Sequence, residues 1–171
     1  KKMEVEEELE KRKRLQLAKL YLYLGHFYLL VYDYQKSLQA YQKFASFRIK
    51  KLQDSTFFYG LGLVYFTFGA FKYAARAFLC SIYKDSYFQR INEIHFRLGL
   101  IYKELNNTSF SLRHFRLSLI DSLSSMSSIS KSDIKFCIAN LYEVNNHHRE
   151  ALDKYEELIR PEASTTDGGN H

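Results

Sequence analysis

Apolar residues recur along most of the chain at spacings of three and four, which is the period of an amphipathic helix. The pattern is interrupted at residues that favour turns, namely Asp33, Gly69, the pair 106–107 and the pair 145–146. We expect the following helices in chain order: 15–31, 34–47, 54–67, 70–84, 91–105, 108–120, 131–144 and 147–160. Since no strand pattern is present, the sequence predicts an all-α protein made of four helix pairs.

One short signature returns in the first helix of each pair. It reads "LGHFY" at 24–28, "LGLVY" at 61–65, "LGLIY" at 98–102 and, more loosely, "IANLY" at 138–142. The spacings between copies are 37, 37 and 40 residues. A fixed period between about 20 and 50 residues is typical of solenoids, so the helix pairs are expected to stack along one axis.

Four positions of each copy alternate between small and large side chains. A small residue is followed three positions later by tyrosine, and the second helix then carries another small residue and, four positions on, a large ring. These sets are Gly25, Gly62, Gly99 and Ala139; Tyr28, Tyr65, Tyr102 and Tyr142; Ser37, Ala74, Ser111 and Ala151; and Tyr41, Phe78, Phe115 and Tyr155. The alternation suits two helices that cross closely, because a ring on one helix fills the space that a small residue leaves on the other.

This pattern resembles the tetratricopeptide repeat, which implies a right-handed αα superhelix of about four repeats. We expect a charged helical extension at 1–17, a repeat domain at 18–161 and a disordered tail at 162–171. The repeats would span about 18–51, 55–88, 92–125 and 132–161. The serine-rich segment 121–133 reads as a solvated loop between copies, and we expect Asp54, Thr108 and Ser132 to cap helix N-termini.

Several phrases are more specific than the repeat demands, above all "YGLGLVYF" at 59–66 and "EIHFRLGLIYK" at 93–103. Between about Leu24 and Ile159 the chain resembles the repeat array of the UTX and UTY family, the jumonji-type demethylases of histone H3 lysine 27. The resemblance implies a nuclear docking module that joins an MLL-type histone methyltransferase complex. A scaffold of another transcriptional complex, such as a Cyc8-like corepressor, is the alternative.

No enzymatic chemistry is predicted for this chain. A jumonji centre needs iron held by two histidines and a carboxylate on a β-barrel, and this chain has no strands to build one. His26, His95 and His114 are scattered along the sequence, and no nucleophile is paired with a base at a recognisable spacing. The two cysteines match no zinc or redox motif. We therefore expect no cofactor and no metal, an intracellular setting, and no membrane segment.

Charge is unevenly distributed. Residues 48–116 carry eleven Lys and Arg against four Asp and Glu, a net charge of +7, whereas residues 131–171 have a net charge of −3. A basic middle favours an acidic partner, but no nucleic-acid-binding module is visible, so direct nucleic-acid binding is not expected.

The predicted partner site is the concave side of the solenoid, which the first helices line. The residues expected to form this groove are Tyr59, Leu63, Phe66, Phe96, Arg97, Lys103, Phe136 and Asn140. Exposed rings with basic residues would suit a protein segment with apolar anchors and acidic character. Two other uses of the repeat are disfavoured: of the positions that grip a C-terminal carboxylate only Arg97 fits, and the asparagine ladder of glycosyltransferase arrays is missing.

The last predicted helix leaves apolar residues without cover. Leu152 and Leu158 lie where a further repeat would pack in a longer array. We expect the isolated chain to self-associate.

Overall fold

The structure, a computed structural model, describes residues 2–120 and 129–160. This part of the chain forms eight α-helices, one short 3-10 helix at Lys50–Leu52 and no strand. The α-helices are α1 (Lys2–Leu30), α2 (Tyr34–Ser46), α3 (Ser55–Thr67), α4 (Phe71–Lys84), α5 (Ile91–Glu104), α6 (Thr108–Ile120), α7 (Lys131–Val144) and α8 (His148–Ile159). The predicted boundaries are therefore confirmed within one or two residues, except that α1 begins at Lys2. The tail 162–171 and most of the serine-rich segment lie outside the described residues.

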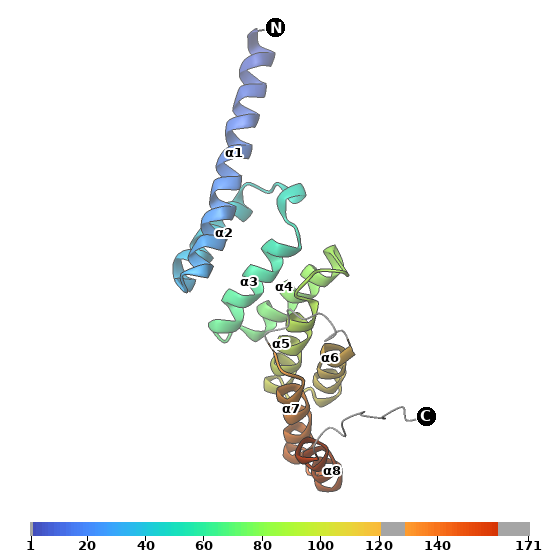
Figure 1. Cartoon of the computed structure of the whole chain (residues 1–171). Helices are drawn as coiled ribbons and strands as arrows, with labels where there is room; N and C mark the ends of the chain where they lie inside the picture. Colours follow the sequence, from blue (N-terminus) through green and yellow to red (C-terminus); the bar gives the residue numbers. More distant parts are fainter. Residues whose placement is uncertain (1, 121–128, 161–171) are drawn as a thin grey trace, which may run out of the picture.

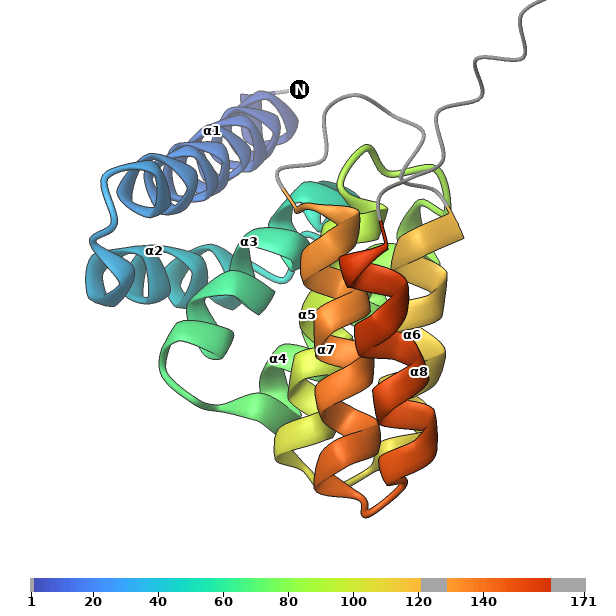
Figure 2. The same ribbon diagram turned by 60° about the horizontal axis from the view of Figure 1, so that its bottom comes forward.

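Consecutive helices form antiparallel pairs that stack into a TPR-like solenoid (Figure 1). The pairs are α1 with α2, α3 with α4, α5 with α6 and α7 with α8, and each second helix also contacts the first helix of the next pair. In Figure 2 the last two pairs lie side by side, with α1 and α2 on the opposite side of the molecule. α1 projects well beyond its partner because its first half has no helix beside it (Figure 1).

The small-to-large packing predicted within each pair is confirmed. A methyl group added at Gly62 would lie 2.6 Å from the Phe78 ring, and one at Gly99 would lie 2.5 Å from the Phe115 ring. A methyl group added at Gly25 would lie 2.4 Å from the Tyr41 ring. All three rings are completely buried, so each glycine is needed for close approach of a ring rather than for a turn.

The small residues of the second helices have a further role that the pattern does not reveal. The Ser37 hydroxyl donates a hydrogen bond to the Gly25 carbonyl at 2.9 Å, and Ser111 donates to the Gly99 carbonyl at 2.7 Å. Both serines are completely buried. A hydroxyl and a main-chain carbonyl thus satisfy each other inside the pair, where an unpaired hydroxyl would be costly.

Left-handed residues end the first helices. The φ angle lies between 56° and 69° at Tyr32, Gly69, Asn106 and Asn146, which confirms the predicted turns. In the first copy the left-handed residue is Tyr32, one position before the predicted Asp33.

Side-chain caps begin several of the helices. Asp54 caps α3 as predicted, with its carboxylate accepting a hydrogen bond from the Phe57 amide at 2.8 Å. The prediction for Ser132 is wrong, because Ser130 takes the extended conformation that a cap requires and accepts from the Ser132 amide. Thr108 is the first helical residue of α6, and the Asn107 side chain accepts from the Phe110 amide instead.

Candidate functional site

The first helices α1 and α3 enclose a recess of about 400 Å³ between the first two pairs. Its lining is mainly apolar, with a histidine and an arginine as the basic groups. The lining residues are His26, Leu29, Leu30, Tyr32, Thr56, Tyr59, Gly60, Leu63 and Arg90. A concave apolar surface with a few polar groups is the usual form of a binding site.

The floor of the recess is fixed by the hydroxyl of Tyr41, which reaches through from α2. This hydroxyl forms a 2.8 Å hydrogen bond with His26 Nδ1 and lies directly against Gly60, where a methyl group would collide with it. Burial lowers the pKa of His26, with a small opposing effect of Asp54, and burial raises the pKa of Tyr41. Both groups are therefore neutral at pH 7, and the floor carries no charge.

The charge of the site lies at its rim, where Glu93 joins two arginines. Its Oε1 accepts hydrogen bonds from Arg97 at 2.7 and 3.1 Å, and its Oε2 accepts one from Arg90 at 3.1 Å. Burial tends to raise the pKa of Glu93, but the hydrogen bonds and charge of Arg97 and the bonds from Tyr59 and Arg90 together lower it. One carboxylate faces two guanidinium groups, so the rim keeps a net positive charge.

The two arginines differ in how much they are held. The Arg97 side chain is 28% exposed and its guanidinium lies 5.4 Å from the centre of the Phe66 ring. Arg90 is 59% exposed and lies over the Tyr59 ring at 5.8 Å. Arg90 is therefore the cation at the recess that can reach a ligand, whereas Arg97 packs on Phe66 and donates two hydrogen bonds to one oxygen of Glu93.

The residues predicted for the groove separate into two groups. Leu63 lines the recess, Phe66 and Arg97 pack on each other beside it, and Lys103 donates a 2.5 Å hydrogen bond to the Asn140 side chain across α5 and α7. These contacts join neighbouring first helices along one face. We call this surface, from the recess through Arg97 to Asn140, the first-helix face.

Phe96 and Phe136 lie outside this surface, whereas Tyr59, which occupies the same position in its repeat, lines the recess. All three occupy the position three residues before the small residue of the first helix. The centre of each ring lies 5.8 to 6.3 Å from the centre of the large ring of its own pair, which is Phe78, Phe115 or Tyr155. Tyr59 is only 8% exposed and Phe96 is half-buried, so the expectation of exposed rings is wrong for Tyr59. The next pair covers this position, because it is a stacking contact between repeats. Phe136 is 55% exposed because no described pair follows it.

A histidine pair inside the third repeat was missed by the sequence reasoning, which treated the histidines as scattered. His95 of α5 and His114 of α6 lie with their Nδ1 atoms 3.0 Å apart, both buried, and Tyr102 stacks on His114 at 5.4 Å. Burial, the charge of His95 and Arg113 lower the pKa of His114 to about 4. Their copies in the second pair, Phe58 and Ala77, give no hint of this contact, so only the three-dimensional pairing reveals it.

Two classes of site are missing from residues 2–120 and 129–160. No three or more His, Cys, Asp or Glu side chains are grouped there so that they could hold a metal ion. None of the helices within these residues is both long and apolar enough to span a membrane.

Solved structures with the same arrangement of helices confirm the fold class. MamA superposes with a TM-score of 0.65 at 16% identity, covering 83% of this chain and 76% of its own. BtubC from P. vanneervenii superposes with a TM-score of 0.68 at 13% identity, and the match covers 92% of this chain and 68% of BtubC. A Podosopora anserina protein described as a kinesin light chain with nearly identical TPR-like repeats superposes with a TM-score of 0.63 at 13% identity. The match covers 88% of this chain and 77% of that protein. At these identities the likeness establishes the TPR-like fold alone.

Part of the chain is similar in sequence to two transcriptional corepressors. The general transcriptional corepressor ssn6 of Schizosaccharomyces pombe is 33% identical over 72 residues, which cover 42% of this chain and 6% of the corepressor. The general transcriptional corepressor trfA of Dictyostelium discoideum is 35% identical over 71 residues, covering 42% and 5%. The chain thus matches only a small part of these relatives. No protein-family model matches the chain.

Proposed function

We propose that this chain is a non-catalytic protein-interaction scaffold of a nuclear transcriptional complex and that the first-helix face is its docking surface. The observation that carries the proposal is the apolar recess with a reachable cation at its rim, on a repeat fold. The similarity to two general transcriptional corepressors supports the setting. A Cyc8-like corepressor scaffold is therefore the leading form of the proposal.

The chemistry of the recess defines the segment that it would bind. Leu29, Leu30 and Leu63 offer apolar walls for one or two large side chains, and Arg90 offers a partner for a carboxylate at the rim. Because His26 is neutral and hydrogen-bonded to Tyr41, it can stack on an apolar group without a charge penalty. We expect the ligand to be a helical or extended protein segment with an apolar anchor next to an Asp or Glu.

A second form of the proposal is favoured by the phrases "YGLGLVYF" and "EIHFRLGLIYK". In this form the chain is the docking module of a UTX-like histone H3 lysine-27 demethylase and its partners are subunits of an MLL-type methyltransferase complex. The whole protein would then carry a jumonji domain outside this chain. Both forms use the same surface and differ in the partner.

Affinity capture from nuclear extract, read by quantitative mass spectrometry, tests the proposal and separates the two forms. Thr56→Trp fills the recess from an exposed position, and Arg90→Glu reverses the charge at the rim. Ser109→Trp on α6 and Lys84→Glu on α4 are matched controls on exposed positions of second helices.

We expect both recess variants to lose the captured transcriptional subunits at least tenfold while both controls retain them. Corepressor subunits among the lost proteins favour the leading form, and histone-methyltransferase subunits favour the second. Equal capture by the recess variants and the parent chain would overturn the assignment of the docking surface. Phe96→Ala is unsuitable for this test, since Phe96 packs against the core ring Phe115.

A further inference from the structure

The outer side of α1 exposes residues at positions that are buried in every other copy. Leu20 is 53% exposed and Phe27 is 59% exposed. These two positions lie five residues before and two residues after the small residue of the first helix. In the second, third and fourth copies they are occupied by Phe57 and Val64, by Ile94 and Ile101, and by Ile134 and Leu141. These six side chains are 0 to 3% exposed, because the preceding helix pair packs on them. We call Leu20 and Phe27 the head positions.

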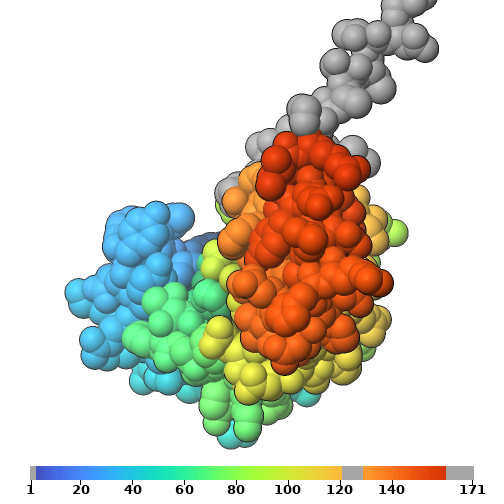
Figure 3. All heavy atoms as spheres, turned by 90° about the horizontal axis from the view of Figure 1, so that it is seen from below, coloured from blue at the N-terminus to red at the C-terminus, as the bar shows by residue number. Residues whose placement is uncertain are grey.

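The opposite end of the solenoid exposes the matching positions. Phe136, Leu152 and Ile159 are 55%, 58% and 81% exposed, and we call them the tail positions. α8 forms the surface that faces the viewer in Figure 3, with no described helix laid over it. At the internal junctions the tail counterparts are covered by the head residues of the next pair. In the second copy they are Tyr59, Ala75 and Ile82, and all three belong to the cluster that contains Ile94 and Ile101.

We infer that the head of one copy of this chain packs on the tail of a second copy, so that the molecule extends its own stack by self-association. Leu20 and Phe27 would take the places that Ile94 and Ile101 occupy inside the molecule. Phe136, Leu152 and Ile159 would supply the surface beneath them. Both halves of the junction are present on the same chain, and they repeat a contact that the chain already makes three times. The inference does not depend on the first-helix face.

Charge favours this arrangement over a parallel contact between two α1 helices. Residues 11–30 of α1 contain five Lys and Arg and no Asp or Glu, whereas α8 contains four Asp and Glu against two Lys and Arg. A head-to-tail contact brings opposite charges together. A parallel contact between two α1 helices would instead align the basic run 11–14 with itself.

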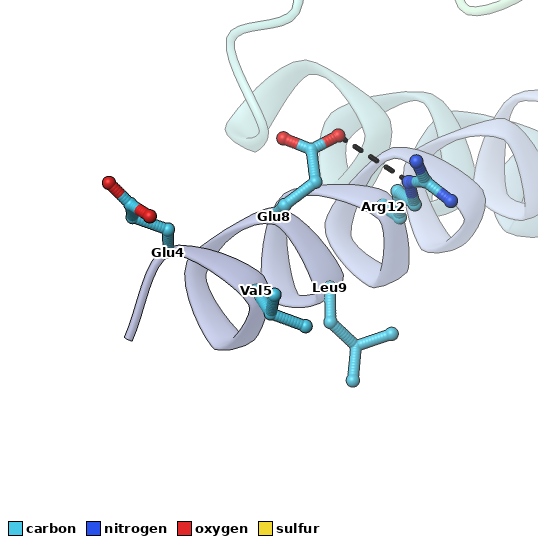
Figure 4. Close-up of a pocket in the computed structure, with 5 residues that line it drawn as sticks. All are labelled: Glu4, Val5, Glu8, Leu9 and Arg12. Carbon is cyan, nitrogen blue, oxygen red and sulfur yellow. Dashed lines mark hydrogen bonds and ion pairs between the residues drawn. The ribbon is translucent and has the colours of Figure 1, made fainter. Parts of the chain in front are cut away.

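The first turns of α1 provide the competing arrangement that a test must exclude. Val5 and Leu9 project from the same side of α1, away from the ion pair of Glu8 and Arg12 (Figure 4). At 100° per residue they share a face with the head positions, so two α1 helices could in principle pair along this stripe. Such a pair would be symmetric and would leave the tail unused.

Complementary variants distinguish these arrangements by light scattering and sedimentation. The head variant carries Leu20→Glu and Phe27→Glu, and the tail variant carries Leu152→Glu and Ile159→Glu. For the parent chain we expect species larger than the 20.3 kDa monomer that grow with concentration, since a head-to-tail contact need not close. Each variant alone should be monomeric. Their equimolar mixture should form a 1:1 dimer that grows no further, because it retains one intact head and one intact tail.

Each other outcome overturns the inference. A parent chain that stays monomeric at every concentration excludes the junction. A tail variant that still dimerises alone identifies pairing through α1, and a head variant that still dimerises identifies pairing through α8. The substituted residues are more than half exposed, so the helical circular dichroism should persist. If a double variant loses it, Phe27→Gln and Leu152→Gln replace the pairs, with the same expected pattern.

Discussion

Gly62→Ala tests whether the packing of the large rings determines the fold. The added methyl group would lie 2.6 Å from two carbon atoms of the Phe78 ring, where ordinary contacts are 3.4–4 Å. The ring is completely buried between its own pair and the next, so it has little room to move. The ring or the helix must therefore shift by roughly 1 Å, which is an overpacked core.

The expected magnitude follows from two opposing effects. Overpacking of this kind costs about 1–3 kcal/mol of unfolding free energy. Replacement of glycine by alanine inside a helix stabilises by about 1 kcal/mol. The difference is a net destabilisation of about 0–2 kcal/mol, or up to several degrees in Tm.

A double-mutant cycle isolates the contact. Phe78→Leu removes the ring edge that the methyl group would meet, so in the F78L background Gly62→Ala should be neutral or stabilising. Urea unfolding followed by circular dichroism measures all four proteins. If Gly62→Ala destabilises the F78L background as much as it destabilises the parent chain, the ring contact is not the reason for the glycine.

Three further predictions concern buried polar groups. The unfolded state binds a proton at His114 below about pH 6.5, whereas the folded state binds it only near pH 4. The free energy of unfolding should therefore be constant above pH 6.5 and fall by up to about 3 kcal/mol toward pH 4. The variant His95→Phe with His114→Ala, which copies the second repeat, should flatten this dependence in urea titrations at several pH values. Ser111→Ala should cost about 1 kcal/mol in thermal unfolding, because it removes a buried hydrogen bond between the two helices of the pair; an unchanged Tm would contradict this. Tyr41→Phe should cost about 1–2 kcal/mol by removing the hydrogen bond to His26, and a more stable variant would show that this bond does not hold the recess floor.

The sequence predicted the helix pairs because each copy repeats the same few positions, and a repeated pattern averages out local ambiguity. The turn at Gly69 and the cap at Asp54 depend on single residues with strong local preferences, so they were predictable as well. The stacking contacts were not, because periodicity places Tyr59 on a helix face without showing what the next pair lays over it. Burial of that ring is a tertiary effect.

The site depends on exceptions to the repeat rather than on its consensus. The hydroxyl of Tyr41 occupies the space in front of Gly60, whereas Phe78 has no hydroxyl and the equivalent position on the following helix is Arg97. A large hydroxyl-bearing ring in one repeat and a glycine in the next thus form a correlated pair. The correlation spans two repeats, and it becomes interpretable only when the stacking register is known.

The docking role of the first-helix face is tested most directly by site-specific photo-crosslinking in nuclear extract. A photoreactive amino acid at position 63 lies in the recess, and one at position 83 lies on α4, where Tyr83 is 89% exposed. The proposed scaffold should crosslink from position 63 to a small set of transcriptional subunits, and Arg90→Glu should abolish those crosslinks. Crosslinks to the same subunits from position 83 but not from position 63 would contradict the account.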